Sequence, residues 1–158
     1  MTQATNTPTL DAVICEIDIA APPARVFEAL TDVKQLTTWW GAEPTVSLKF
    51  WQIDPRLGGH WRMESSGCGQ IEVNGVTNFE SHGTIVEFDP PRALAYTWIA
   101  NWHDNPSQET LVRWELAPTT SGTKVKVTHS GLSQLATARR DYSGGWPGVL
   151  ELLKNFLN

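Results

Sequence analysis

Basic residues are few and scattered along this 158-residue chain. Twelve Lys and Arg stand against seventeen Asp and Glu, and the formal net charge is −5. No run or stripe of basic residues occurs, whereas a nucleic acid or an anionic membrane surface is bound through such a stripe. The sequence therefore argues against both as partners.

Long apolar runs and a cysteine framework are lacking as well. No segment approaches the ~20 consecutive apolar residues of a membrane-spanning helix, and the first ten residues have neither the charged start nor the apolar stretch of a signal peptide. Cys15 and Cys68 have no metal-ligand spacing, and a disulfide framework needs more cysteines than these. We therefore expect a soluble protein of a reducing compartment, the cytoplasm.

Motifs for metal binding and for covalent catalysis are also missing. The four histidines include no pair at the spacing of a zinc site. Cys15 and Ser130 lack the flanking pattern or partner of a nucleophile. Gly144-Gly145 has neither the preceding strand nor the Lys of a phosphate-binding loop. We expect no metal, no cofactor and no catalytic residue.

Tryptophan, in contrast, is abundant. Eight Trp occur in a chain whose hydrophobic fraction of 41% is ordinary for a globular protein. A single domain of this length buries roughly 68–70% of its unfolded-chain surface, so it needs no disulfide for stability. Because Trp combines a large apolar area with one N–H donor, it suits cores, interfaces and pocket walls.

Alternation of apolar and polar residues predicts the strands. In the first, Val13, Cys15 and Ile17 share one face, while Glu16 and Asp18 lie on the other. The alternation breaks near residue 83, which indicates a bulge or kink. The predicted strands are residues 12–20, 46–50, 60–66, 76–88, 94–98, 112–116 and 125–129.

Helical patterns flank this run of strands. Two short helices, residues 22–30 and 32–40, follow the first strand, and a period of 3.6 residues appears after Gly131. Gly144-Gly145 marks where the regular C-terminal helix begins, with Pro147 in its first turn. Residues 133–140 are expected to form a looser lead-in helix. We expect residues 1–10 to be a flexible tail and residues 11–158 to form one domain.

Short connections between the strands predict an antiparallel sheet. One apolar face of that sheet must be covered, and the single long amphipathic helix is narrower than six to seven strands. The sheet must therefore curve around the helix, and a cavity is left unless large side chains fill it. The predicted fold is α+β, a helix-grip fold.

Several short motifs stand in a familiar order from about residue 11 to 157. Together they resemble the activator of 90-kDa heat-shock protein ATPase homologue-like family, part of the START / Bet v 1-like (SRPBCC) superfamily. The motifs are Pro22-Pro23-Ala24-Arg25-Val26-Phe27-Glu28-Ala29-Leu30, Trp39-Trp40-Gly41, Gly58-Gly59-His60-Trp61, Glu87-Phe88-Asp89-Pro90-Pro91, Leu94-Ala95-Tyr96-Thr97-Trp98, Thr128-His129-Ser130-Gly131-Leu132 and Gly145-Trp146.

The resemblance implies the same helix-grip fold and several functions. Founding members of the family use such a domain, with a separate N-terminal domain, to stimulate a chaperone ATPase. We expect no room for that second domain here, because the grip fold takes nearly the whole chain. Relatives in the superfamily bind lipids, sterols or plant hormones, or cyclise polyketides, and no motif of this chain selects one of these.

The candidate ligand-binding residues are those expected at the lining or mouth of the cavity. Trp39 and Trp40 either form a lip at the mouth or divide between core and surface; the lip is our hypothesis, because adjacent helix residues point about 100° apart. The full set is Trp39, Trp40, Trp61, Met63, Phe79, Trp98, Trp114, His129, Trp146 and Leu150.

His129 is the most informative ionisable candidate, because its strand register directs it inward beside Val125 and Val127. It is either a neutral histidine hydrogen-bonded within the structure or a polar anchor for a ligand. Residues 103–105 read as a solvated turn. Trp51, Trp102 and Tyr142 are expected to be exposed, and exposed aromatics are typical of a protein contact, which leaves a homodimer open.

The favoured function is non-catalytic binding of a small, largely apolar ligand, aromatic or lipid-like. The first alternative is a protein-interaction module that acts on a chaperone or a stress-response partner. The second is an enzyme of the cyclase or hydratase kind, which would need at least two convergent ionisable groups in the cavity.

Overall fold

The computed structural model describes residues 4–8, 11–40, 46–67 and 72–158. Strands and helices follow one another in the order that the sequence predicts, with one strand added near the N-terminus. They are β1 (Thr5–Pro8), β2 (Val13–Ile19), α1 (Pro23–Thr31), α2 (Val33–Trp39), β3 (Val46–Ile53), β4 (His60–Gly67), β5 (Asn78–Asp89), β6 (Ala93–Ala100), β7 (Thr110–Pro118), β8 (Thr123–Ser130) and α3 (Ala136–Leu157).

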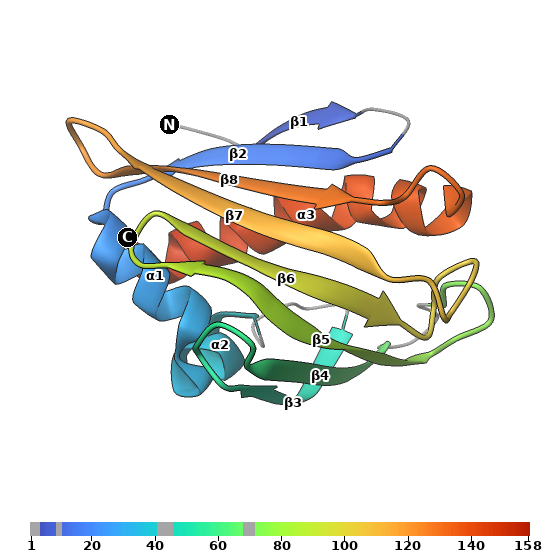
Figure 1. Ribbon diagram of the computed structural model, residues 1–158. Coiled ribbons are helices and arrows are strands. Elements are labelled where there is room, and N and C mark those ends of the chain that lie inside the picture. Colours follow the sequence, from blue (N-terminus) through green and yellow to red (C-terminus); the bar gives the residue numbers. More distant parts are fainter. Residues whose placement is uncertain (1–3, 9–10, 41–45, 68–71) are drawn as a thin grey trace.

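All strands pair antiparallel in one sheet of order β1-β2-β8-β7-β6-β5-β4-β3. The sheet curves, α3 runs across its concave side, and α1 and α2 lie at one end (Figure 1). Strands β2 to β8 thus make the curved seven-stranded sheet of a helix-grip fold. The predicted fold class is confirmed. The sheet curves because one helix can cover the apolar face of so broad a sheet only if the sheet bends around it.

Strand β1 lies within the segment that the sequence analysis expected to be a flexible tail. Thr5 pairs with Glu16 and Pro8 with Val13, so these residues extend the sheet beyond β2. The backbone N–H of Ala4 also donates to Oε1 of Glu151 on α3, at 3.1 Å. An edge strand is paired on one side only, so it tolerates a Pro without an N–H donor and does not need alternating apolar residues. This polar, Pro-containing segment therefore lacks the sequence pattern by which the other strands were predicted.

A β-bulge in β3 reverses the expected orientation of Trp51. The pairing of β3 with β4 shifts between Leu48 and Phe50, and Trp51 lies opposite the buried Met63. Because neighbouring residues of a strand face opposite sides, one extra residue moves every later side chain to the other face. Trp51 is therefore 3% exposed, and the expectation of an exposed Trp51 is wrong.

The C-terminal helix begins about ten residues earlier than expected. Helix α3 runs from Ala136 through Gly144, Gly145 and Pro147 without a break. Its first N–H groups are satisfied from a distant loop, because the carboxylate of Asp104 accepts from Thr137 at 3.0 Å and from Ala138 at 2.9 Å. This cap lies 33 residues away from Thr137 in sequence, so no local pattern could reveal it.

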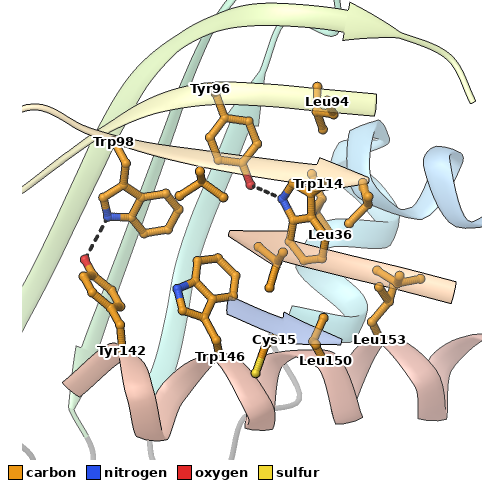
Figure 2. Packing of buried hydrophobic residues seen from close by; sticks show 14 of the residues in the cluster. Cys15, Leu36, Leu94, Tyr96, Trp98, Trp114, Tyr142, Trp146, Leu150 and Leu153 are labelled. Carbon is orange, nitrogen blue, oxygen red and sulfur yellow. Dashed lines mark hydrogen bonds between the residues drawn. The ribbon is translucent and has the colours of Figure 1, made fainter. Parts of the chain in front are cut away.

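The core lies between the sheet and the helices, and five of its Trp side chains have hydrogen-bond acceptors. Figure 2 shows Trp114 beside Tyr96, whose hydroxyl accepts from the indole at 2.9 Å. Trp61 donates to the carbonyl of Thr97 at 2.9 Å. It does so across Gly83, where a Cβ atom would lie 2.7 Å from the indole nitrogen of Trp61. A glycine is therefore required there.

Among the described residues, no helix is both long enough and apolar enough to cross a membrane.

Candidate pocket between the sheet and helix α3

A pocket of about 310 Å³ lies between the middle of α3 and the part of the sheet made by β3 to β6. Its volume is near the lower end of the range for small-molecule sites. Aromatic and aliphatic side chains make most of the wall. The lining residues are Trp40, Leu48, Met63, Ser65, Val73, Phe79, Trp98, Trp102, Asp141, Tyr142, Gly145, Trp146, Val149 and Leu152.

Half of the predicted site residues line this pocket. They are Trp40, Met63, Phe79, Trp98 and Trp146. The other half are buried in the surrounding core, each 2% exposed or less: Trp39, Trp61, Trp114, His129 and Leu150. Strand alternation and helix period place all of these side chains on inward faces, but both a pocket wall and a filled core need inward apolar residues.

Trp39 and Trp40 divide between the core and the pocket. Trp39 is 1% exposed, and its indole donates to the carbonyl of Ala29 at 2.8 Å. Trp40 is half-buried and forms part of the pocket wall, its ring 6.0 Å from that of Trp146. The hypothesis that both Trp side chains form a lip at the mouth is therefore wrong. Adjacent helix residues point about 100° apart, so only one of the two reaches the pocket.

His129 is fully buried with both ring nitrogens engaged. The indole of Trp146 donates to Nδ1 at 3.1 Å, and Nε2 lies 2.8 Å from the hydroxyl of Thr110. Because an indole can only donate, Nδ1 carries no proton, so the proton is on Nε2 and faces Thr110. That hydroxyl in turn donates to the carbonyl of Trp98 at 2.7 Å. His129 is thus the neutral, internally bonded histidine of the first alternative.

The sequence did not indicate that a second histidine, His103, is buried. His103 is 2% exposed, although residues 103–105 were expected to form a solvated turn. Its Nε2 lies 2.7 Å from the hydroxyl of Tyr142, and that hydroxyl also accepts from the indole of Trp98 at 3.0 Å (Figure 2 shows the latter bond). Because no other acceptor for the Tyr142 proton occurs among the described residues, we assign Tyr142 as the donor to His103. Tyr142 is 6% exposed, so its expected exposure is wrong too.

One sequence signal could have placed Tyr142 inward. Tyr142, Trp146 and Leu150 follow one another at intervals of four residues, so they lie on one side of a helix. The intervening Gly144-Gly145 pair, read as the start of the helix, concealed this continuity.

Burial keeps the titratable groups behind the pocket uncharged. It lowers the pKa of His103 to about 4, although Asp104 opposes the shift. Burial, and then the positive charge that His103 would carry, hold the pKa of His129 well below its ordinary value. Burial likewise raises the pKa of the Tyr142 hydroxyl, and that of the Cys15 thiol to about 11.

Trp102 and Asp141 add polar groups to the pocket wall. Trp102 is 7% exposed, contrary to its expected exposure, because its ring packs edge-on against Phe79 at 5.3 Å. Its indole N–H has no hydrogen-bond partner among the described residues. Asp141 is exposed and is the one charged side chain among the described residues that line the pocket. Apolar surroundings raise the pKa of its carboxyl.

This geometry defines a helix-grip domain with an aromatic-walled pocket under its C-terminal helix. Residues 20–158 match the family described as "Activator of Hsp90 ATPase homolog 1-like protein". The chain belongs to this family, and the resemblance read from its motifs is confirmed. No curated protein matches the chain.

Solved structures with the same fold come from several bacteria. A protein from Rhodobacter sphaeroides has 19% sequence identity and a TM-score of 0.76, over 98% of this chain and 95% of that one. A protein from Chromobacterium violaceum has 21% identity and a TM-score of 0.75, over 93% and 97%. An AHSA1-like protein from Aeromonas hydrophila has 20% identity and a TM-score of 0.70, over 92% and 90%. At these identities the likeness concerns the fold.

Proposed function

We propose that this protein binds a small, largely apolar molecule in the pocket between the sheet and α3, and that it does so without catalysis. The observation that carries the proposal is the pocket itself. Eight Trp are available to fill the interior, yet about 310 Å³ stays open beside four aromatic residues that the sequence places inward. A wall of this kind favours a ring or another flat apolar body.

The buried polar groups support binding over catalysis. A general acid or base needs a proton that it can exchange with a bound molecule. Both nitrogens of His129 and the hydroxyl of Tyr142 are already committed to bonds within the protein. Cys15 lies in the core outside the pocket, and its raised pKa keeps the thiol protonated. We place this binding function in the cytoplasm.

The interaction-module alternative predicts a filled interior and an exposed apolar patch around Trp39. Trp39 is instead 1% exposed. The sequence left a homodimer open because Trp51, Trp102 and Tyr142 were expected to be exposed, but all three are buried. These observations favour a small-molecule ligand over a protein partner.

Gly145 offers a direct test of the pocket. It lies in the pocket wall, and a Cβ atom built on it meets nothing within 4 Å. Leu at this position therefore has an unobstructed Cβ and adds a side chain at the pocket wall, and a helical Gly replaced by Leu also gains helix propensity. We expect Gly145→Leu to fold normally and to weaken binding of the neutral probe N-phenyl-naphthylamine, followed by its fluorescence.

Gly144→Leu is the matched control. Gly144 is also open, but it does not line the pocket. The proposal fails if the wild-type protein does not bind the probe, or if both variants bind it as well as the wild type does. Native mass spectrometry of the purified protein adds a second readout, since a co-purified small molecule should be lost in Gly145→Leu alone.

A further inference from the structure

The polar groups of the pocket wall point to the chemistry of the ligand, given that the proposed function holds. The wall presents the rings of Trp40, Trp98, Trp102 and Trp146 beside a single carboxylate, Asp141. Faces of aromatic rings attract cations, and Trp attracts them most strongly. No Lys, Arg or His is among the described residues of the wall. The pocket is therefore suited to positive charge and opposed to negative charge.

Asp141 is available to a ligand. It forms no ion pair with any described residue. It sits on α3 directly before Tyr142, one turn ahead of Gly145, so it lies on the part of the wall that the helix contributes. A carboxylate held against apolar neighbours loses part of its hydration, and a charged amine beside it would restore favourable electrostatics.

We propose that the pocket selects a small ring compound that carries a protonated amine, paired with Asp141. The matching carboxylate is rejected, because it would meet Asp141 with no cation to compensate. This narrows the aromatic or lipid-like ligand class to amines and excludes fatty acids and aromatic acids.

Three compounds with the same ring and the same hydroxyl test the charge preference: tyramine, tyrosol and para-hydroxyphenylacetate. We expect affinity, measured by calorimetry or NMR titration, to fall in that order, with about tenfold between amine and alcohol, the effect of one charged hydrogen bond. Asp141→Asn should bring the three affinities together. Glu80→Gln, which removes an equal charge from an exposed residue outside the pocket, should leave the order unchanged.

The proposal is overturned if the carboxylate binds as tightly as the amine, or if Asp141→Asn keeps the preference. If none of the three compounds binds while N-phenyl-naphthylamine does, the amine proposal falls and the apolar pocket stands. If that probe fails as well, the proposed function falls.

Discussion

The indole of Trp146 on α3 donates to Nδ1 of His129 on β8 across 3.1 Å, and this bond joins the helix to the sheet at the back of the pocket. Two further hydrogen bonds extend the chain, from Nε2 of His129 to the hydroxyl of Thr110 and from that hydroxyl to the carbonyl of Trp98. The position of the helix therefore depends on polar bonds as well as on apolar packing. Each link has a defined donor and acceptor, so removal of a link leaves a buried group unpaired.

Trp146→Phe should destabilise the protein more than its lost area alone would suggest. It leaves Nδ1 of His129 buried and without a donor, which costs about 1–3 kcal/mol in addition to the packing loss. Urea unfolding measures the difference. Trp102→Phe is the matched control, since it removes a similar volume from the same pocket but an N–H that has no partner. Equal losses in the two variants would contradict the role assigned to the bond.

On acidification, the protein should unfold at a higher pH than it would if only its carboxylates were protonated. His103 and His129 are neutral in the folded state with pKa values below the ordinary 6.5, that of His103 at about 4. The unfolded chain therefore binds more protons below about pH 6.5, and stability, complete above that value, falls as the pH drops toward 4. Each histidine contributes about 1.4 kcal/mol per pH unit in this window.

Unfolding in urea at several pH values between about 7 and 5 measures this slope. His103→Gln should make it shallower, whereas replacement of the exposed His82 should not. An unchanged slope in His103→Gln would show that His103 does not contribute.

The fold could be predicted from the sequence because the patterns that indicate its strands and helices are local. Alternation placed Trp61, Met63 and Trp98 on inward faces, and all are buried. The failures share a cause, since each depends on a contact distant in sequence or on an irregularity within a strand. The bulge before Phe50 turned Trp51 inward, and Asp104 capped a helix 33 residues further along the chain.

The candidate site was harder to predict than the fold. An inward Trp looks the same in sequence whether it lines a pocket, as Trp98 does, or fills the core, as Trp114 does. The distinction depends on how neighbouring rings divide the space, which only coordinates show. His103 and Tyr142 were missed because a loop histidine and a Tyr before two glycines both read as exposed.

Gly83→Ala should be strongly destabilising, because a Cβ atom there would lie 1.7 Å from the carbonyl oxygen of Thr97. Relief of that overlap requires β5 to move away from β6, at a cost of about 3 kcal/mol or more. Gly144→Ala, on an open face of α3, should instead stabilise by about 0.5–1 kcal/mol. Thermal unfolding of the two variants compares them directly. A stable Gly83→Ala protein would contradict the close approach of Trp61 and β6.

Asp104→Ala should loosen the first turn of α3 and thereby the helical wall of the pocket. Its carboxylate satisfies the N–H groups of Thr137 and Ala138, and these bonds hold the pKa of the carboxyl below its ordinary value although burial opposes the shift. Loss of such a cap costs about 1 kcal/mol. We expect faster hydrogen exchange at the first amides of α3 and weaker binding of N-phenyl-naphthylamine, because Tyr142 and Trp146 lie within the next three turns.

Two controls separate the cap from a general effect of charge. Asp104→Asn keeps one acceptor oxygen and should retain most of the protection from exchange. Glu109→Ala removes an exposed acid from the same loop and should change neither exchange nor binding. Unaltered hydrogen exchange at Thr137 and Ala138 in Asp104→Ala would show that packing holds the start of α3 and that the carboxylate does not contribute.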